Sequence, residues 1–287
     1  MNLQGTTPGP LIVATDLDGT LLDHYTYDWQ PAARAIELLK QKCIPLVINT
    51  SKTADEVVLL QRELDIEDPF IVENGSAVYI HCRDERFDLP GDVYDDGSHR
   101  IKILGGQRES IVATLTSLKR DRGWRFDMFS DFDSDELAAL TGLSSGNALL
   151  ALQRHYSEPL IWRDSQDRYS DFCDAVRQRG LSLLRGGRFV HVLGQTGKGA
   201  ALRWLADHYR AAGTTLLIAL GDSANDIDML RVADYPVLVK SPSHDFPAID
   251  GNVIRTEETG PAGWNLAVID LVGTICERLS NGSRTGH

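Results

Sequence analysis

The feature that most constrains this 287-residue chain is a set of short apolar runs, each of which ends in polar residues. The run Leu11–Thr15 leads into Asp16-Leu17-Asp18-Gly19-Thr20, and the run Leu216–Leu220 leads into Gly221-Asp222-Ser223-Ala224-Asn225-Asp226. A run without polar alternation is typical of a strand buried on both faces of a parallel sheet. Because two aspartates one residue apart repel each other, their place at a strand end indicates a bound divalent cation, a phosphoryl group, or both.

Helical patterns alternate with strand-like runs in the first and last parts of the chain. Pro31 opens one helix, Thr53-Ala54-Asp55-Glu56 matches a capping box at the start of another, and Gly197-Lys198 opens a third. This alternation predicts an α/β fold, a Rossmann-like doubly wound parallel sheet that binds ligands at the carboxyl ends of its strands. The other strands predicted in these parts are Pro45–Asn49, Phe70–Glu73, Ser76–Ile80, Pro236–Val239 and Asn252–Arg255.

The character of the sequence changes between about residues 85 and 190. A polar, turn-rich stretch is followed by predicted antiparallel strands and paired helices, which indicates a separate α+β module. We therefore predict a core domain in two parts, residues 1–84 and 193–287, with an inserted α+β cap domain at residues 85–192. The elements predicted in the insertion are strands Arg100–Leu104, Leu160–Arg163, Leu181–Leu184 and Phe189–Leu193, and helices Glu109–Asp121, Ser134–Leu152 and Arg168–Arg179.

Charge and cysteine content narrow the classes of partner and location. A formal net charge of −12 argues against nucleic acid or an anionic membrane as a partner. No apolar stretch approaches the roughly 18 residues of a membrane span, and Met1–Pro10 has neither the basic nor the apolar region of a signal peptide. The four cysteines lie far apart without a C-x-x-C spacing, which argues against a zinc site or a disulfide framework and indicates the cytoplasm. The sequence gives no indication of oligomeric state.

The acidic residues after the two strands have the chemistry of phosphoryl transfer. A carboxylate such as Asp16 can attack phosphorus to form an aspartyl-phosphate, and Asp18 can protonate the leaving oxygen and then activate water. Oxygen ligands without His or Cys suit Mg²⁺, and the predicted metal residues are Asp16, Asp18, Asp222 and Asp226. Of these, Asp222 is expected to be a direct ligand and Asp226 to orient the metal or its waters. The alternatives are a solvated strand-to-turn corner and a helix cap formed by Ser223 with Asp226, which is compatible with metal binding.

Two further residues complete a predicted phosphate site. The hydroxyl of Thr50, at the end of a predicted strand, can donate a hydrogen bond to a phosphoryl oxygen. Lys198 lies at a predicted helix start, where its charge and the free backbone amides favour an anion. The segment is not a Walker A loop, because it lacks the glycine five residues before Gly197 and a Ser or Thr after the lysine. Lys52 is either a solvated lysine or a substrate contact.

These four segments, in this order and spacing, resemble the motifs of the haloacid dehalogenase-like phosphohydrolases. The positions that match the four motifs are, in order, Asp16 with Asp18, then Thr50, then Lys198, then Asp222 with Asp226. The resemblance implies that Asp16 is the nucleophile, that Asp18 is the general acid and base, and that Mg²⁺ is the cofactor. It also implies that the insertion is a cap of the class called C2B.

Further segments resemble the mannosyl-3-phosphoglycerate phosphatases. They are Thr26–Ala32, Ser51–Thr53, Glu73–Gly75, Leu160–Asp164, Gly187–His191 and Gly260–Trp264. This narrower resemblance implies a Mg²⁺-dependent phosphomonoesterase that converts mannosyl-3-phosphoglycerate into mannosylglycerate, a compatible solute, and phosphate. The implied partner is therefore a small phosphorylated sugar–glycerate molecule that carries a carboxylate besides its phosphate.

A substrate carboxylate requires a positive centre beyond the phosphate site. Arg163 and Arg188 are the candidates, because arginine can bind a carboxylate through two hydrogen bonds. Glu73 and Asn74 can hydrogen-bond sugar hydroxyls, and His191 can contact polar groups of the ligand. The alternatives are surface ion pairs for the arginines, a tight turn for Asn74 and a structural role for His191.

Other functions stay open on the sequence alone. One is the hydrolysis of glucosyl-3-phosphoglycerate or of sugar phosphates in general, and another is a sugar phosphomutase, which would require a sugar 1,6-bisphosphate. A third is a non-catalytic module that binds Mg²⁺ and phosphate. Asp18 argues against the third, because a phosphate sensor gains nothing from an acid that speeds hydrolysis.

Overall fold

The computed structural model describes residues 10–186, 188–211 and 213–282. Met1–Gly9 and Gly187, on which two sequence predictions fall, lie outside the described residues. Within the described part of the chain, no helix is long and apolar enough to cross a membrane.

The chain forms two compact units. The first draws on the described residues of Met1–Val47 and Tyr209–His287, and the second on those of Ile48–His208. The domain boundaries at residues 84/85 and 192/193 stay a prediction.

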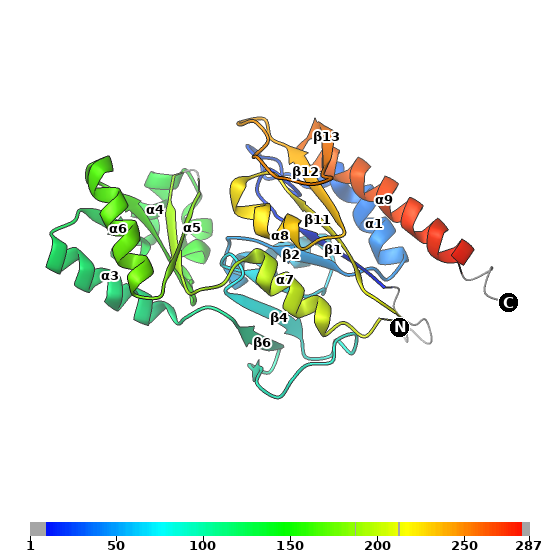
Figure 1. The fold of residues 1–287 in the computed structure, drawn as a ribbon, viewed down its shortest axis with the longest axis horizontal. Helices are drawn as coiled ribbons and strands as arrows, with labels where there is room; N and C mark the ends of the chain where they lie inside the picture. The colour runs from blue at the N-terminus through cyan, green and yellow to red at the C-terminus, as the bar shows by residue number, and fades with distance from the viewer. Residues whose placement is uncertain (1–9, 187, 212, 283–287) are drawn as a thin grey trace. The chain divides into compact units, whose positions relative to one another are not determined.

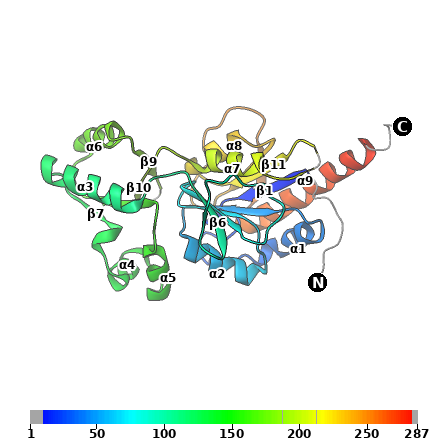
Figure 2. The same ribbon diagram turned by 90° about the horizontal axis from the view of Figure 1, so that it is seen from below.

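In the first unit, the described residues form parallel strands with helices on both faces (Figures 1 and 2). The strands are, in sheet order, β13 (Ile254–Thr259), β12 (Tyr235–Lys240), β11 (Leu216–Gly221) and β1 (Leu11–Thr15). Helix α8 (Ile227–Arg231) covers one face, and helices α1 (Ala33–Gln41) and α9 (Gly260–Gly282) cover the other. The unit also contains two 3₁₀ turns, η1 (Gln30–Ala32) and η3 (Ala224–Asp226). This double cover explains why every residue of β1 is buried and apolar or hydroxylic.

The strand register of the first unit brings two acidic segments to one edge. Thr15 lies opposite Leu220 in the parallel pair of β1 and β11, and the backbone N–H of Asp16 donates to the Leu220 carbonyl at 2.9 Å. Asp16 and Asp222 each follow the last residue of their strand. Both acids therefore lie at the carboxyl edge, where the sequence predicts a ligand site.

The second unit contains two sheets. Strands of the first are, in order, β2 (Leu46–Asn49, which begins in the first unit's segment), β3 (Phe70–Val72), β4 (Ala77–His81), β6 (His99–Ile103) and β5 (Tyr94–Asp95). β2 and β3 are parallel and the later pairs antiparallel, with α2 (Ala54–Leu64) and α7 (Lys198–Asp207) on opposite faces (Figure 2). The predicted capping box is confirmed, because the Thr53 hydroxyl accepts from the Glu56 N–H and the Glu56 carboxylate accepts from the Thr53 N–H.

The other sheet of the second unit is antiparallel. Its strands are, in order, β7 (Phe126–Met128), β8 (Ser157–Trp162), β10 (Val190–Leu193) and β9 (Ser182–Arg185). Its helices are α3 (Arg108–Arg122), α4 (Ser134–Thr141), α5 (Ser145–Leu152) and α6 (Gln166–Gln178), with the 3₁₀ turn η2 at Phe129–Asp131. α3 and α6 cover one face through a core of aliphatic and aromatic residues, while α4 and α5 pack on each other around Phe129.

These elements confirm the predicted α/β class, with parallel strands and an α+β region, but several details differ. The single helical stretch predicted at Ser134–Leu152 is wrong: Gly142, at φ +82°, ends α4, and the Ser144 hydroxyl caps α5. The short strands β5 and β7 were not predicted. β6, which the sequence assigns to the insertion, pairs with β4.

Candidate active site

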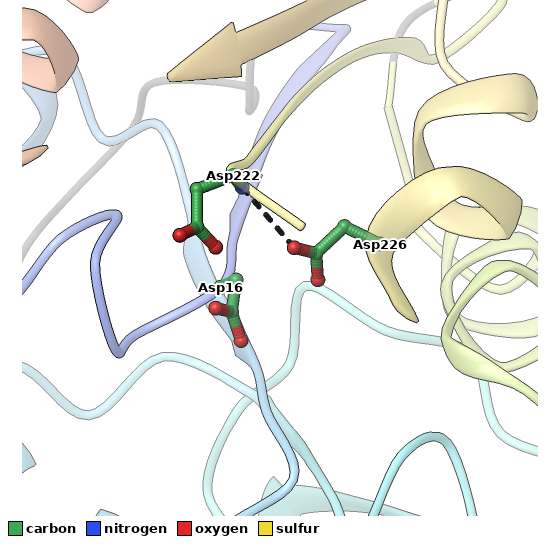
Figure 3. A group of neighbouring side chains, drawn as sticks. All are labelled: Asp16, Asp222 and Asp226. Atoms are coloured by element: carbon green, nitrogen blue, oxygen red, sulfur yellow. Dashed lines mark hydrogen bonds between the residues drawn. The ribbon is translucent and has the colours of Figure 1, made fainter. Parts of the chain in front are cut away.

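Three carboxylates converge in the first unit. Asp16 follows β1, Asp222 follows β11, and Asp226 ends the turn η3; all three side chains are buried. Each contributes an oxygen that lies within 4.8 Å of the others, and Figure 3 shows the three groups facing a common space. Close, buried carboxylates repel one another and lose hydration, so a bound cation would offset a large electrostatic cost.

One oxygen of Asp226 is committed to the backbone. Its Oδ2 accepts from the N–H groups of Asp222 and Ser223, both at 3.1 Å, and the first of these bonds is the dashed line in Figure 3. The predicted cap is therefore present, and it fixes the strand-to-helix turn that carries Asp222. Asp226 thus fixes the backbone of Asp222 and Ser223 and is at the same time one of the three carboxylates of the cluster.

Two glycines make room for the carboxylates. Gly19 has φ +80°, and a Cβ there would lie 2.6 Å from Oδ2 of Asp222. At Gly221 a Cβ would lie 2.4 Å from the Cβ of Asp226. These close approaches explain why each acidic segment carries a glycine, because a side chain at either position would displace a carboxylate of the cluster.

Asp18 does not belong to the three-carboxylate group. It is half-buried in a tight loop, in which Asp18 forms a bridge with Leu22 and the Gly19 N–H donates to the Leu22 carbonyl at 2.9 Å. Its predicted roles as acid, base and metal residue stay predictions.

His244 also lies beside the cluster, a contact that no sequence pattern predicts. Its Nε2 is 3.4 Å from Oδ2 of Asp222, while its Nδ1 is 3.0 Å from the Asp245 carbonyl. Both neighbours are hydrogen-bond acceptors, so a neutral imidazole can donate to only one of them. A single histidine in an irregular loop carries no periodic signal that would have indicated this contact.

The second unit holds the predicted phosphate residues. Thr50 follows β2 and is buried, its N–H donates to the Ile71 carbonyl, and its hydroxyl accepts from the Lys52 N–H at 3.2 Å. Lys198 begins α7 and is fully buried. The Asn49 side chain donates to the Lys198 carbonyl at 3.0 Å and so ties the end of β2 to the start of α7.

Glu73 and Asn74 lie in a loop with left-handed backbone, at φ +49° and +59°. The Glu73 carboxylate is engaged by the backbone N–H groups of residues 155 and 156 and by the Ser157 hydroxyl at 2.6 Å. The Asn74 amide is buried, and neither its oxygen nor its nitrogen has a hydrogen-bond partner among the described residues. Such an amide is costly unless a ligand or water bonds it. The predicted ligand contact is thus more compatible with Asn74 than with Glu73.

Three of the remaining predicted substrate residues have partners within the protein, and the fourth, His191, has a lowered pKa. Lys52 pairs with Glu56 at 3.8 Å, the half-exposed Arg163 pairs with Asp127 at 2.8 Å, and Arg188 donates to the carbonyls of residues 140 and 141. Burial, with smaller contributions from the charges of Arg154 and Lys198, lowers the pKa of His191 to about 3. The roles of these four side chains in substrate binding stay predictions.

Comparison with known proteins identifies the family. Residues 13–88 match the family described as haloacid dehalogenase-like hydrolase, and residues 173–246 match sucrose-6F-phosphate phosphohydrolase. The chain is 37% identical over 265 residues to glucosyl-3-phosphoglycerate/mannosyl-3-phosphoglycerate phosphatase of Methanococcoides burtonii, across 91% of this chain and 97% of that protein. The chain belongs to the haloacid dehalogenase-like phosphatases. It is a phosphoric monoester hydrolase, as the sequence predicted.

Solved structures with the same fold are more distant in sequence. Thermoplasma acidophilum 0175 aligns with a TM-score of 0.61 at 16% identity, over 90% of this chain and 95% of that one. The haloacid dehalogenase-superfamily phosphatase BT1666 of Bacteroides thetaiotaomicron aligns with a TM-score of 0.57 at 19% identity, over 84% and 88%. At these identities the likeness concerns the fold, which it confirms. Hydrolases of this family generally use Mg²⁺, and the buried carboxylate cluster is compatible with such an ion.

Proposed function

We propose that this phosphatase is Mg²⁺-dependent and removes the phosphate from a glycosyl-3-phosphoglycerate, with the mannosyl compound as substrate and the glucosyl compound as the alternative. The convergence of Asp16, Asp222 and Asp226 carries the proposal, because it supplies both a buried nucleophile and metal ligands at one strand edge. The name of the Methanococcoides burtonii relative covers both sugars, which supports the glycosyl-phosphoglycerate class without choosing between them.

The reaction proceeds in two displacements at phosphorus. A carboxylate oxygen of Asp16 attacks phosphorus, the new O–P bond forms as the ester O–P bond breaks, and Asp18 gives its proton to the leaving alkoxide. Asp18 then takes a proton from a water molecule whose oxygen attacks the aspartyl-phosphate. The Asp16–phosphate bond breaks, which releases inorganic phosphate and restores both carboxyl groups.

The metal belongs with Asp16, Asp222 and Asp226, whose donor set of buried oxygens fits a hard cation. When bound, Mg²⁺ supplies positive charge against the phosphate oxygens and so lowers the barrier to attack by an anion. Asp222 would be a direct ligand, and Asp226 would orient the metal or its waters while it fixes the backbone of Asp222 through the two hydrogen bonds described above.

Thr50 and Lys198 hold the remaining phosphate oxygens, through a hydroxyl and through an ammonium group at a helix start. The side-chain amide of Asn74, which has no hydrogen-bond partner within the described ranges, bonds the polar groups of the substrate. The cap domain, residues 85–192, excludes water and selects the leaving group, with Arg163, Arg188 and His191 as its contacts. The setting we propose is the cytoplasm, with mannosylglycerate as the product.

Phosphate release by the purified protein with Mg²⁺ tests this proposal. The panel consists of mannosyl-3-phosphoglycerate, glucosyl-3-phosphoglycerate, 3-phosphoglycerate and hexose phosphates, with Asp16→Asn as the blank. We expect kcat/KM for one glycosyl-phosphoglycerate to exceed that for hexose phosphates about 100-fold, or ~2.7 kcal/mol of transition-state binding. A flat profile that Asp16→Asn abolishes would keep the phosphatase and reject the substrate class.

A further inference from the structure

The second unit contains a buried ion pair that contacts the segment after the predicted phosphate residue Thr50. Glu73 and Arg154 are both almost fully buried, and the Arg154 Nε lies 3.5 Å from Oε2 of Glu73. Buried charges persist only where their hydrogen-bonding capacity is satisfied. The contacts of this pair therefore show which backbone segments it holds.

The Glu73 carboxylate holds the segment that leads into β8. Its oxygens accept from the His155 N–H at 2.8 Å, from the Tyr156 N–H, and from the Ser157 hydroxyl at 2.6 Å. The backbone of the same loop holds the residues after β2, because the Glu73 N–H donates to the Lys52 carbonyl at 3.0 Å.

The Arg154 guanidinium holds the same two regions from the other side. Its Nη2 donates to the Ser51 carbonyl at 2.7 Å, and both Nη2 and Nε lie within 3.3 Å of the Ser157 hydroxyl oxygen. A planar fork can make these bonds at once, which a lysine ammonium on its flexible stem cannot. The Thr53 hydroxyl also donates to the Leu150 carbonyl at 3.0 Å, which gives a second tie between the two regions.

We propose that Glu73 and Arg154 act together as positioning residues that fix the backbone of Thr50–Thr53. Ser51, whose carbonyl Arg154 holds, directly follows Thr50, and Glu73 directly precedes Asn74. The Thr50 carbonyl accepts the Asn74 N–H at 2.9 Å, so the pair holds the chain on both sides of this contact. This inference rests on the proposed function, in which Thr50 binds a phosphate oxygen. It assigns Glu73 to the loop rather than to the sugar.

The test compares kcat and KM for Arg154→Lys, Arg154→Met, Glu73→Gln and the double variant Glu73→Gln/Arg154→Met. Substrates are a glycosyl-3-phosphoglycerate and p-nitrophenyl phosphate, which has no carboxylate. We expect kcat to fall by between about 10- and 100-fold on both substrates, the scale of a displacement of up to 1 Å, with KM nearly unchanged. The double variant should lose no more than the worse single one, because the two side chains act as a unit.

Arg86→Lys is the matched control. Arg86 lies in the same unit and pairs with Asp68 at 2.7 Å and Asp84 at 2.8 Å, and within the described part of the chain no hydrogen bond or ion pair joins it to Thr50–Thr53. It should lower the melting temperature as Arg154→Lys does while kcat stays within about twofold of wild type, since only lost positioning reaches the chemistry. Arg154→Lys keeps the charge, so it also yields folded protein if Glu73→Gln does not.

Two outcomes would overturn the inference. Wild-type kcat in folded Arg154→Lys would show that charge alone suffices. A rise in KM confined to the carboxylate-bearing substrate would show that Arg154 contacts the ligand. Failure of the proposed function is distinguishable, because the wild-type protein itself would then release no phosphate from the glycosyl-3-phosphoglycerate or show no preference for it, whereas the inference is judged from the ratio of variant to wild-type kcat on p-nitrophenyl phosphate.

Discussion

Gly19→Ala should disturb the carboxylate cluster without removing any charge. A Cβ at this position would lie 2.6 Å from Oδ2 of Asp222, and real Cβ contacts essentially never fall below 3.0 Å. The loop or the carboxylate must therefore retreat by about half an ångström, on a scale where ~1 Å costs ~10²-fold in rate. We expect kcat/KM to fall about tenfold or more, and half-saturation by Mg²⁺ to move to higher concentration, because Asp222 is displaced.

The same substitution also strains the backbone, so it needs a control with equal strain. Gly19 has φ +80°, and an alanine there costs roughly 1–2 kcal/mol of stability. Gly180 has φ +74° and nothing within 4 Å of a Cβ, so Gly180→Ala carries the strain without the contact.

Urea denaturation should show similar losses of stability in the two variants, whereas phosphate release across a Mg²⁺ titration should separate them. If Gly19→Ala keeps the wild-type rate and Mg²⁺ dependence, the cluster is not the catalytic site.

Three further substitutions test individual interactions. Asp226→Asn keeps an oxygen for the two backbone N–H groups but removes one negative charge. The Mg²⁺ concentration at half-saturation should therefore rise about tenfold, while the melting temperature without metal does not fall. An unchanged Mg²⁺ titration would exclude Asp226 from the site. Thr53→Ala removes the α2 cap and should cost about 1 kcal/mol in urea denaturation, which a value near zero would contradict. The pKa of His191 is about 3 in the folded protein against 6.5 in the unfolded chain, so the unfolded state binds the extra proton and stability falls as the pH drops from about 6.5 toward 3. His191→Gln should remove up to ~1.4 kcal/mol per pH unit of that slope, and parallel curves would refute the lowered pKa.

The parts of the fold that the sequence predicted depend on local signals. β1 and β11 are unbroken apolar runs because helices cover both faces, and α2 begins at a capping box that spans only four residues. The proximity of Asp16 and Asp222 could be predicted because parallel strands end at the same edge of a sheet. Gly142 is also a local signal, because a glycine with left-handed backbone ends a helix, and it separates α4 from α5 where the sequence predicts one helix.

The contacts that the sequence did not reveal join residues far apart in the chain. Arg154 reaches the Ser51 carbonyl across 103 residues, and His244 reaches Asp222 from an irregular loop. Neither belongs to a periodic pattern, so nothing local indicates its partner. Glu73 illustrates the same limit: its residue type suited a sugar contact, whereas the fold surrounds its carboxylate with backbone and hydroxyl donors.

In the proposed mechanism, Asp16 is the group that receives the phosphate. Acid quenching during turnover, followed by mass spectrometry of the peptide that contains Asp16, tests this directly. We expect phosphate on Asp16 in the wild-type protein and none in Asp16→Asn. Phosphate release by Asp16→Asn at the wild-type rate, or a label on another residue, would contradict the mechanism.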